Sequence, residues 1–107
     1  DKDMLVMLIT NLCDNAKKAG ATRIEVNITG SGISVKDNGR GISKEDMKHI
    51  FEIFYQGDAS RNQEGFGLGL ALCQRIAELH HSKLCVESSL QDGSIFSLQF
   101  SYNSLMT

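Results

Sequence analysis

The stretch Gly65-Phe66-Gly67-Leu68-Gly69-Leu70 decides how the rest of the chain is interpreted. Glycine recurs at every second position, and an apolar run with helical spacing continues at once to Leu79. Glycine lets a backbone approach a bound group closely, and the first turn of a helix offers unpaired N–H groups and the positive end of the helix dipole. The stretch therefore fits a phosphate-binding loop at a helix N-terminus. Taken alone, it fits a flexible loop before a core helix equally well.

Composition narrows the class of protein. A chain of 107 residues with 41% hydrophobic and 22% charged residues is enough for one domain with a packed core. The net charge of −2 and the lack of a basic run give no argument for binding to nucleic acid. No apolar stretch is long enough to span a bilayer, and no signal peptide opens the chain. Because the chain begins at Asp1 without a methionine, we expect it to be a piece of a longer protein.

The three cysteines, Cys13, Cys73 and Cys85, lie far apart within apolar patterns, and no Cys-x-x-Cys pair exists. This spacing argues against a zinc site or redox chemistry. We interpret them as small buried hydrophobic residues in a reducing compartment.

Residues 3–19 predict a helix, because their apolar side chains fall on one arc and Gly20 provides a stop. Beside that arc, Asn11, Asn15 and Lys18 project from nearly the same side. Asparagine is a poor helix former, so this stripe suggests two amide oxygens and a cation that face a ligand, such as Mg2+ shared with phosphate. The alternative, which two asparagines alone would favour, is that both amides cap or bridge neighbouring backbone.

Residues 23–28 and 33–37 alternate apolar and polar side chains around the turn Gly30–Gly32, and they predict a β-hairpin. The period of two places Asp37 on the apolar face, where a carboxylate is costly unless it is hydrogen-bonded. Asn38-Gly39-Arg40-Gly41 follows directly. The stretch predicts either an ordinary turn or a carboxylate that accepts a hydrogen bond from an amino group on a flat ring, with glycines that clear space for the ring.

Further along the chain, Ser43 predicts the N-cap of a short helix that carries Met47, Ile50 and Phe51. The polar residues 56–64 predict a mobile lid, whose Arg61 either reaches a phosphate or stays solvated at the surface. We then expect a helix from Gly69 to about His80, a strand over 83–88, a turn at Gln91–Ser94 and a last strand over 96–101.

Four of these stretches, in this order and at this spacing, resemble the motifs of the ATP-binding catalytic domain of sensor histidine kinases. The larger superfamily includes DNA gyrase, mismatch-repair MutL proteins and an ATP-driven chaperone. Residues 11–18 resemble the N box, 37–42 the first glycine box, 51–55 the F box and 65–70 the second glycine box. The resemblance covers residues 3–101. It implies one α+β domain over residues 1–107, a Bergerat-type two-layer α/β sandwich with a mixed, mainly antiparallel sheet and helices packed on one face.

The resemblance also implies roles for single residues. The nucleotide site that it implies comprises Asn15, Lys18, Asp37, Gly39, Gly41, Ile42, Arg61, Gly65, Gly67, Leu68 and Gly69, with Asn11, Asn15 and Lys18 as the catalytic group and Asn15 as the metal ligand. In this site Asp37 accepts a hydrogen bond from the adenine amino group, and Gly39 and Gly41 let adenine lie against the backbone. Lys18 and Arg61 contact phosphate, and the glycines of the second box hinge the lid and cradle phosphate.

The activity implied is that of a cytoplasmic kinase domain, with the full-length protein attached to the inner face of the membrane. It binds ATP with Mg2+ and gives the γ-phosphoryl group to a histidine on a separate dimerisation domain of the same protein. A response regulator receiver domain is the further partner, and the fragment itself contacts neither membrane nor nucleic acid.

We interpret His49, His80 and His81 as structural or surface residues, so we expect no autophosphorylation of the isolated chain. Asn11 stands where hydrolysing members carry a glutamate. An amide is no general base, which favours transfer over hydrolysis.

This sequence departs from the usual family pattern at Ala19, Gln56, Phe66 and His81-Ser82, where the family commonly has an aromatic residue, an arginine, a small residue and a glycine pair. Two alternatives stay open. One is an anti-sigma-factor serine kinase that uses the same nucleotide fold. The other is a degenerate interaction module that has kept the fold without catalysis.

Overall fold

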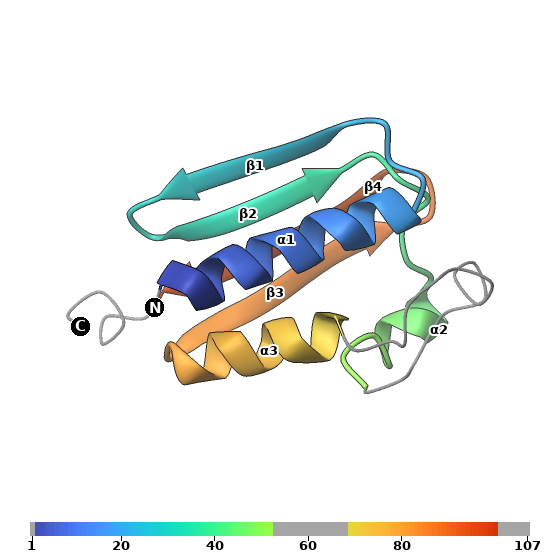
Figure 1. The fold of residues 1–107 in the computed structure, drawn as a ribbon. Helices are drawn as coiled ribbons and strands as arrows, with labels where there is room; N and C mark the ends of the chain where they lie inside the picture. The colour runs from blue at the N-terminus through green and yellow to red at the C-terminus, as the bar shows by residue number, and fades with distance from the viewer. Residues whose placement is uncertain (1, 53–68, 101–107) are drawn as a thin grey trace.

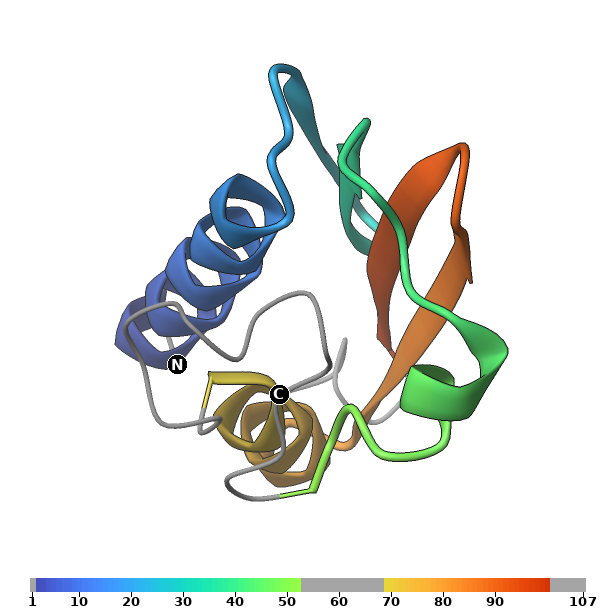
Figure 2. The same cartoon turned by 90° about the vertical axis from the view of Figure 1, so that its right-hand side faces the viewer.

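The computed structural model describes residues 2–52 and 69–100. The elements are, in order, α1 (Lys2–Lys18), β1 (Ile24–Thr29), β2 (Gly32–Asp37), α2 (Lys44–Met47), α3 (Gly69–Leu79), β3 (Ser82–Ser89) and β4 (Gly93–Phe100). The strands form one sheet in the order β1-β2-β4-β3, and α1 and α3 lie on the same face of it (Figure 1 and Figure 2). The predicted α+β two-layer sandwich is therefore confirmed. Within the described part of the chain, no helix combines the length and apolar composition that a bilayer crossing requires.

The sheet differs from the expected mixed sheet in one respect: every pairing among the described strands is antiparallel. The crossover from β2 through α3 to β3 makes those two strands run in the same direction. They do not touch, because β4 turns back from β3 and lies between them. In a simple crossover unit, β2 and β3 would pair in parallel. Here β4 takes the place between them and pairs with both.

The core lies between this sheet and the two long helices. Its buried residues are Leu8, Leu12, Ile33, Val35, Cys73, Ile76, Ala77, Phe96 and Leu98. The strand residues among them come from alternate positions of β2 and β4, which directly oppose one another in the register, as a period of two requires. The edge strand β1 is covered less by the helices. Its Ile28 points to the helix side of the sheet but stays 68% exposed.

Two of the helix ends follow the predicted signals, but α2 is shorter than expected: it ends at Met47, so Ile50 and Phe51, which were predicted to lie on it, fall in the turn that follows. Ser43 is the N-cap of α2, and its hydroxyl accepts a hydrogen bond from the backbone N–H of Asp46 at 3.0 Å. Gly20 follows α1 at φ +79°, the left-handed conformation that ends helices and suits glycine. After α3 the same conformation falls on His81, at φ 53°. The position where the resemblance leads one to expect glycine therefore has a glycine-like backbone with a histidine side chain.

The start of β4 corrects the expected turn at Gln91–Ser94. The strand begins at Gly93, so only residues 90–92 turn the chain. Gly93 has φ +85°, and a Cβ there would collide with the main-chain oxygen of Asp37. Gly93 pairs with Ser89 across the hairpin, and the lack of a side chain there lets the start of β4 run against the end of β2.

Candidate functional site

Helix α1 presents the predicted amide stripe toward the start of α3. Asn11 donates a hydrogen bond from Nδ2 to the carbonyl oxygen of Met7 at 2.9 Å, within its own helix. Its Oδ1 lies 3.4 Å from the place that a Cβ on Gly69 would occupy. The structure therefore brings Asn11 together with Gly69, the first residue of α3 and the last glycine of the second glycine box.

Asn15 lies one helical turn further along α1 and is half-buried. Over residues 2–52 and 69–100, the structure shows no hydrogen bond from its side-chain amide, which leaves the amide oxygen available to a ligand. Lys18 is exposed in the last turn of the same helix. Asn11, Asn15 and Lys18 thus lie in a line along α1, from the end that faces the beginning of α3 towards the loop after β2.

Asp37 is the last residue of β2 and is only 5% exposed. It faces the helices together with Ile33 and Val35, as the alternation predicts. Its Oδ1 accepts a hydrogen bond from the backbone N–H of Gly39 at 2.8 Å. Among the described residues this carboxylate has no other hydrogen bond or ion pair, although buried carboxylates normally accept several. The second oxygen is therefore an acceptor available to a ligand.

The loop after β2 is fastened to the connection between α1 and β1. The side-chain oxygen of Asn38 accepts hydrogen bonds from the backbone N–H groups of Thr22 and Arg23, both at 2.9 Å. Two residues on, Arg40 donates from its backbone N–H to Ala19 at 3.0 Å and from its guanidinium to the carbonyl of Lys18. Asn38 and Arg40 therefore fix Asp37 relative to the end of α1. Sequence reasoning assigned neither residue a role.

The glycines of this loop approach the chain's own backbone closely. A Cβ on Gly39 would lie 2.8 Å from the carbonyl oxygen of Ala19, and one on Gly41 would collide with the carbonyl oxygen of Ser89. Gly41 also has φ +79°. Glycine is therefore required here for the loop to pack between α1 and β3. The contact of Gly39 and Gly41 with adenine stays a prediction.

A pair of serine hydroxyls completes this end of the sheet. Ser94 is 5% exposed, and in the register it stands opposite Asp37 on one side and Ser88 on the other. The Ser88 and Ser94 hydroxyl oxygens are 2.7 Å apart, and Ser88 also accepts from the backbone N–H of Ile42 at 2.8 Å. Both serines were missed, although they continue the inward alternation of Val86 and Phe96.

A cavity of about 530 Å³ opens between α2 and β3, lined by Ile42, Lys44, Met47, Lys48, Val86, Glu87 and Ser88. Of the predicted site residues that the structure describes, only Ile42 borders it. The cavity thus adjoins Ser88, and no residue of α1 borders it.

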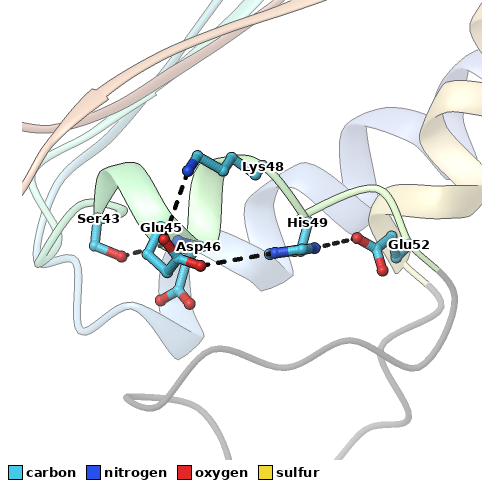
Figure 3. Close-up of polar contacts among 6 residues, drawn as sticks. All are labelled: Ser43, Glu45, Asp46, Lys48, His49 and Glu52. Atoms are coloured by element: carbon cyan, nitrogen blue, oxygen red, sulfur yellow. Dashed lines mark hydrogen bonds and ion pairs between the residues drawn. The ribbon is translucent and has the colours of Figure 1, made fainter.

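Other candidate residues fall into two groups. Arg61, Gly65, Gly67 and Leu68, together with the predicted lid, lie outside the described residues. The histidines take the expected structural or surface positions. His49 lies between Glu45 and Glu52 on the exposed side of α2 and its following turn, where Lys48 also pairs with Glu45 at 3.6 Å (Figure 3). Such solvent-exposed pairs contribute about 1 kcal/mol or less.

All three cysteines are free thiols, but the predicted burial holds for Cys73 alone, since Cys13 and Cys85 are half-buried. Cys73 is fully buried, and burial raises its pKa to about 12. No group of three or more His, Cys, Asp or Glu side chains suited to a metal ion occurs within residues 2–52 and 69–100.

Comparisons with known proteins, by sequence and by structure, point to the same protein family. Residues 1–104 match the family described as "Histidine kinase-, DNA gyrase B-, and HSP90-like ATPase". The sensor histidine kinase YkoH of Bacillus subtilis (strain 168) is 39% identical over 107 residues, which cover 94% of this chain and 24% of YkoH. For the sensor histidine kinase RppB of Synechocystis the identity is 38%, over 92% of this chain and 24% of RppB. The chain thus spans about a quarter of the length of these relatives.

Two solved structures share the fold. The mycobacterial sensor histidine kinase MprB superposes with a TM-score of 0.71 at 23% identity, over 92% of this chain and 72% of that one. Full-length ShkA, crystallised in complex with AMPPNP, superposes with a TM-score of 0.73 at 28% identity, over 94% of this chain and 23% of ShkA. Taken with the motif order and the placement of Asp37 beside α1, these matches show that the chain belongs to the family of histidine kinase-, DNA gyrase B- and HSP90-like ATPases, as an ATP-binding domain of the sensor histidine kinase type.

Proposed function

We propose that this chain binds ATP with Mg2+ and supplies the γ-phosphoryl group to a histidine on the dimerisation domain of the same protein, in the cytoplasm. The observation that carries the proposal is the buried carboxylate of Asp37. It is 5% exposed, keeps one oxygen without a partner among the described residues, and is held beside α1 by the loop that follows it. A buried acceptor of this kind suits an amino group on a planar base.

The residues present also fit a magnesium ion. Asn15 offers an amide oxygen that no described residue engages, and such an oxygen is a hard ligand of the type that Mg2+ takes. One turn earlier on α1, Asn11 lies beside Gly69 at the start of α3, where helix N–H groups favour phosphate. When bound, the ion neutralises charge on the phosphates, and the protein's part is to position them. Lys18 adds a cation at the end of α1.

Transfer, and not hydrolysis, is the reaction that these residues favour. Asn11 has an amide with no useful basicity, and its Nδ2 is engaged with the Met7 carbonyl. It cannot take a proton from water, so the chain lacks a general base at this position of the helix. Phosphoryl transfer to a protein acceptor needs chiefly positioning and charge neutralisation from the nucleotide domain.

The acceptor histidine would belong to a part of the protein that this chain does not cover. The relatives named above are sensor histidine kinases about four times the length of the matched segment, which supports a separate dimerisation domain here. A response regulator receiver domain would then accept the phosphoryl group. ShkA, which shares the fold, was crystallised with AMPPNP, and this supports a nucleotide of the same type here.

Calorimetric titration of the chain with AMPPNP and Mg2+ tests the binding half of the proposal. Saturable heat that depends on Mg2+ is expected, whereas no heat at millimolar nucleotide would leave only a non-catalytic interaction module. The transfer half needs the full-length protein and labelled ATP. Phosphate that is labile in acid but stable in alkali identifies phosphohistidine, whereas acid-stable phosphoserine on a partner would instead identify a serine kinase.

A further inference from the structure

Helix α1 ends in a turn whose carbonyl groups its own chain satisfies only in part. The backbone N–H of Ala21 donates to the carbonyl of Ala16 at 3.1 Å, and that of Gly20 donates to the carbonyl of Lys17 at 3.0 Å. With Gly20 at φ +79°, these two bonds form the Schellman pattern that commonly closes a helix. The pattern leaves out the next two carbonyl groups along the chain.

Those two carbonyl groups belong to Lys18 and Ala19. A continuing helix would pair them with the backbone N–H groups of Thr22 and Arg23. Both of these N–H groups donate instead to the side-chain oxygen of Asn38, at 2.9 Å. The end of α1 therefore presents two carbonyl oxygens, at the negative end of the helix dipole, to another part of the chain.

Arg40 binds both of these carbonyl groups. Its backbone N–H donates to Ala19 at 3.0 Å, and its guanidinium donates to the carbonyl of Lys18. A cation at a helix C-terminus is favourable, and a hydrogen bond from a charged donor is stronger than one from a neutral donor. Arg40 thus completes the cap of a helix that ends 22 residues earlier in the chain.

The loop that carries Arg40 also carries Asp37, the carboxylate of the proposed nucleotide site. Gly39 donates to Asp37 Oδ1 at 2.8 Å, and a Cβ on Gly39 would lie 2.8 Å from the carbonyl oxygen of Ala19. The partner of the guanidinium is Lys18, the residue to which we assign phosphate. A terminal helical turn frays when its carbonyl groups lose their partners, and the Lys18 side chain would then start from a less fixed backbone.

We propose that Arg40 is a positioning residue for the nucleotide phosphates: by capping α1 at the Lys18 carbonyl, it holds the Lys18 side chain in place to contact phosphate. The inference rests on the proposed nucleotide-binding function and deepens it. Arg40 acts through Lys18 and need not touch phosphate itself. The bond to Ala19 comes from the Arg40 backbone, so it stays available when the side chain is changed, and the loop that holds Asp37 keeps this attachment.

A double-mutant cycle between Arg40 and Lys18 tests the inference. Calorimetry gives the affinity for AMPPNP with Mg2+, and an NMR titration gives the affinity for adenosine, which has no phosphate. Arg40→Met removes the charge and the donors but keeps an aliphatic side chain, whereas Arg40→Lys keeps the charge. Arg75→Met is the matched control, because Arg75 is an exposed arginine on α3 that pairs with Glu78 at 3.2 Å.

We expect Arg40→Met to weaken AMPPNP binding by about fivefold and adenosine binding by no more than about twofold, because only the phosphates depend on Lys18. Lys18→Ala should weaken AMPPNP binding by about tenfold, and Arg40→Met added to it should cost less than about twofold more, since the two residues act as one unit. Arg40→Lys should stay within about twofold of the unmodified chain. Arg75→Met should change neither affinity.

Independent, additive losses in the cycle would show that Arg40 acts on the nucleotide by itself, and they would overturn the inference. Equal weakening of AMPPNP and adenosine in Arg40→Met would show a purely structural role and overturn it as well. If Arg40→Met fails to fold, Arg40→Gln replaces it in the cycle, and the same two criteria decide.

The unmodified chain separates this inference from the proposed function. A chain that binds neither AMPPNP nor adenosine contradicts the proposed function, and the inference falls with it. AMPPNP binding that is present and is unaffected by Arg40→Met contradicts only the assignment of Arg40.

Discussion

Gly41 lies so close to Ser89 that a side chain at position 41 would occupy the space of the Ser89 carbonyl oxygen. This approach brings the loop after β2 against β3, and it occurs at φ +79°, where only glycine is free of strain. The contact explains why the chain needs glycine at this point in the absence of any bound molecule.

Gly41→Ala should therefore destabilise the fold by about 3 kcal/mol or more, because it adds both a steric collision and left-handed backbone strain. Urea unfolding monitored by circular dichroism measures the loss. Gly30→Ala is the matched control, since nothing lies within 4 Å of a Cβ there, and it should change stability by no more than about 0.5 kcal/mol. Similar losses in the two variants would contradict the packing described for Gly41.

His81→Gly should stabilise the chain by about 0.5–1 kcal/mol. His81 ends α3 at φ 53°, and removing its Cβ relieves strain that exceeds the entropy cost of glycine at such a position. His80→Gly should act in the opposite direction, because the His80 ring nitrogen Nδ1 hydrogen-bonds the Ile76 carbonyl at 2.9 Å. Thermal midpoints of the two variants test the pair, and a lower midpoint for His81→Gly would refute the strain.

Asp37→Asn should weaken binding of adenine nucleotides by about 1–3 kcal/mol while the fold is retained. The asparagine oxygen can still accept from Gly39, and only the second, open oxygen becomes an N–H donor. Calorimetry with AMPPNP gives the change in affinity. Asp14→Asn removes an exposed carboxylate from α1 and serves as the control. If Asp37→Asn binds as tightly as the unmodified chain, the carboxylate does not contact the base.

Asn15→Ala should abolish the dependence of nucleotide affinity on Mg2+, since it removes the proposed amide ligand of the ion. Titrations with AMPPNP in Mg2+ and in EDTA measure that dependence. Asn27→Ala, on the exposed outer side of β1, should leave it intact, because among the described residues the Asn27 amide hydrogen-bonds only Glu25, at 3.1 Å. A full Mg2+ effect in Asn15→Ala would place the metal ligand elsewhere.

Cys73 should make the fold less stable at alkaline pH. Its folded-state pKa is raised by burial from 9.0 to about 12, so the folded chain keeps a proton that the unfolded chain loses. The contribution is complete below pH 9 and declines as pH rises from there towards 12. Between pH 8 and pH 10, the free energy of unfolding should fall by about 1 kcal/mol more in the original chain than in Cys73→Ala. Parallel pH dependences in the two proteins would contradict the shift.

Most of the fold could be predicted from the sequence because its signals are local. The arc of α1, the alternation of β2 and the Ser43 cap each depend on neighbours within a few residues, and the inward position of Asp37 follows from the same period of two. The start of β4 could not be predicted. Gly93 pairs with Ser89 and packs on the backbone of Asp37, but the glycine beside Asp92 gives a turn signal when it is considered with its neighbours alone.

The parts of the site that sequence reasoning missed are those whose partners are backbone groups far along the chain. Arg40 bonds to the Lys18 carbonyl, and Ser88 to the Ile42 N–H. A main-chain partner leaves no trace in residue identity, so nothing in the sequence distinguishes these side chains from a surface arginine or an ordinary strand serine. The two amides of α1 were found because asparagine is unusual within a helix.

The sheet order has a consequence for how the chain acquires its structure. β4, the last of the described strands in sequence order, sits in the interior of the sheet between β2 and β3, and without it these two strands have no edge in common. The β1–β2 hairpin and β3 therefore become one sheet only when β4 has formed between them, which makes the folding transition dependent on contacts that are distant in sequence and correspondingly slow. A chain that lacks β4 could keep the packing of α1 on α3 but would lose the continuous sheet that both helices cover.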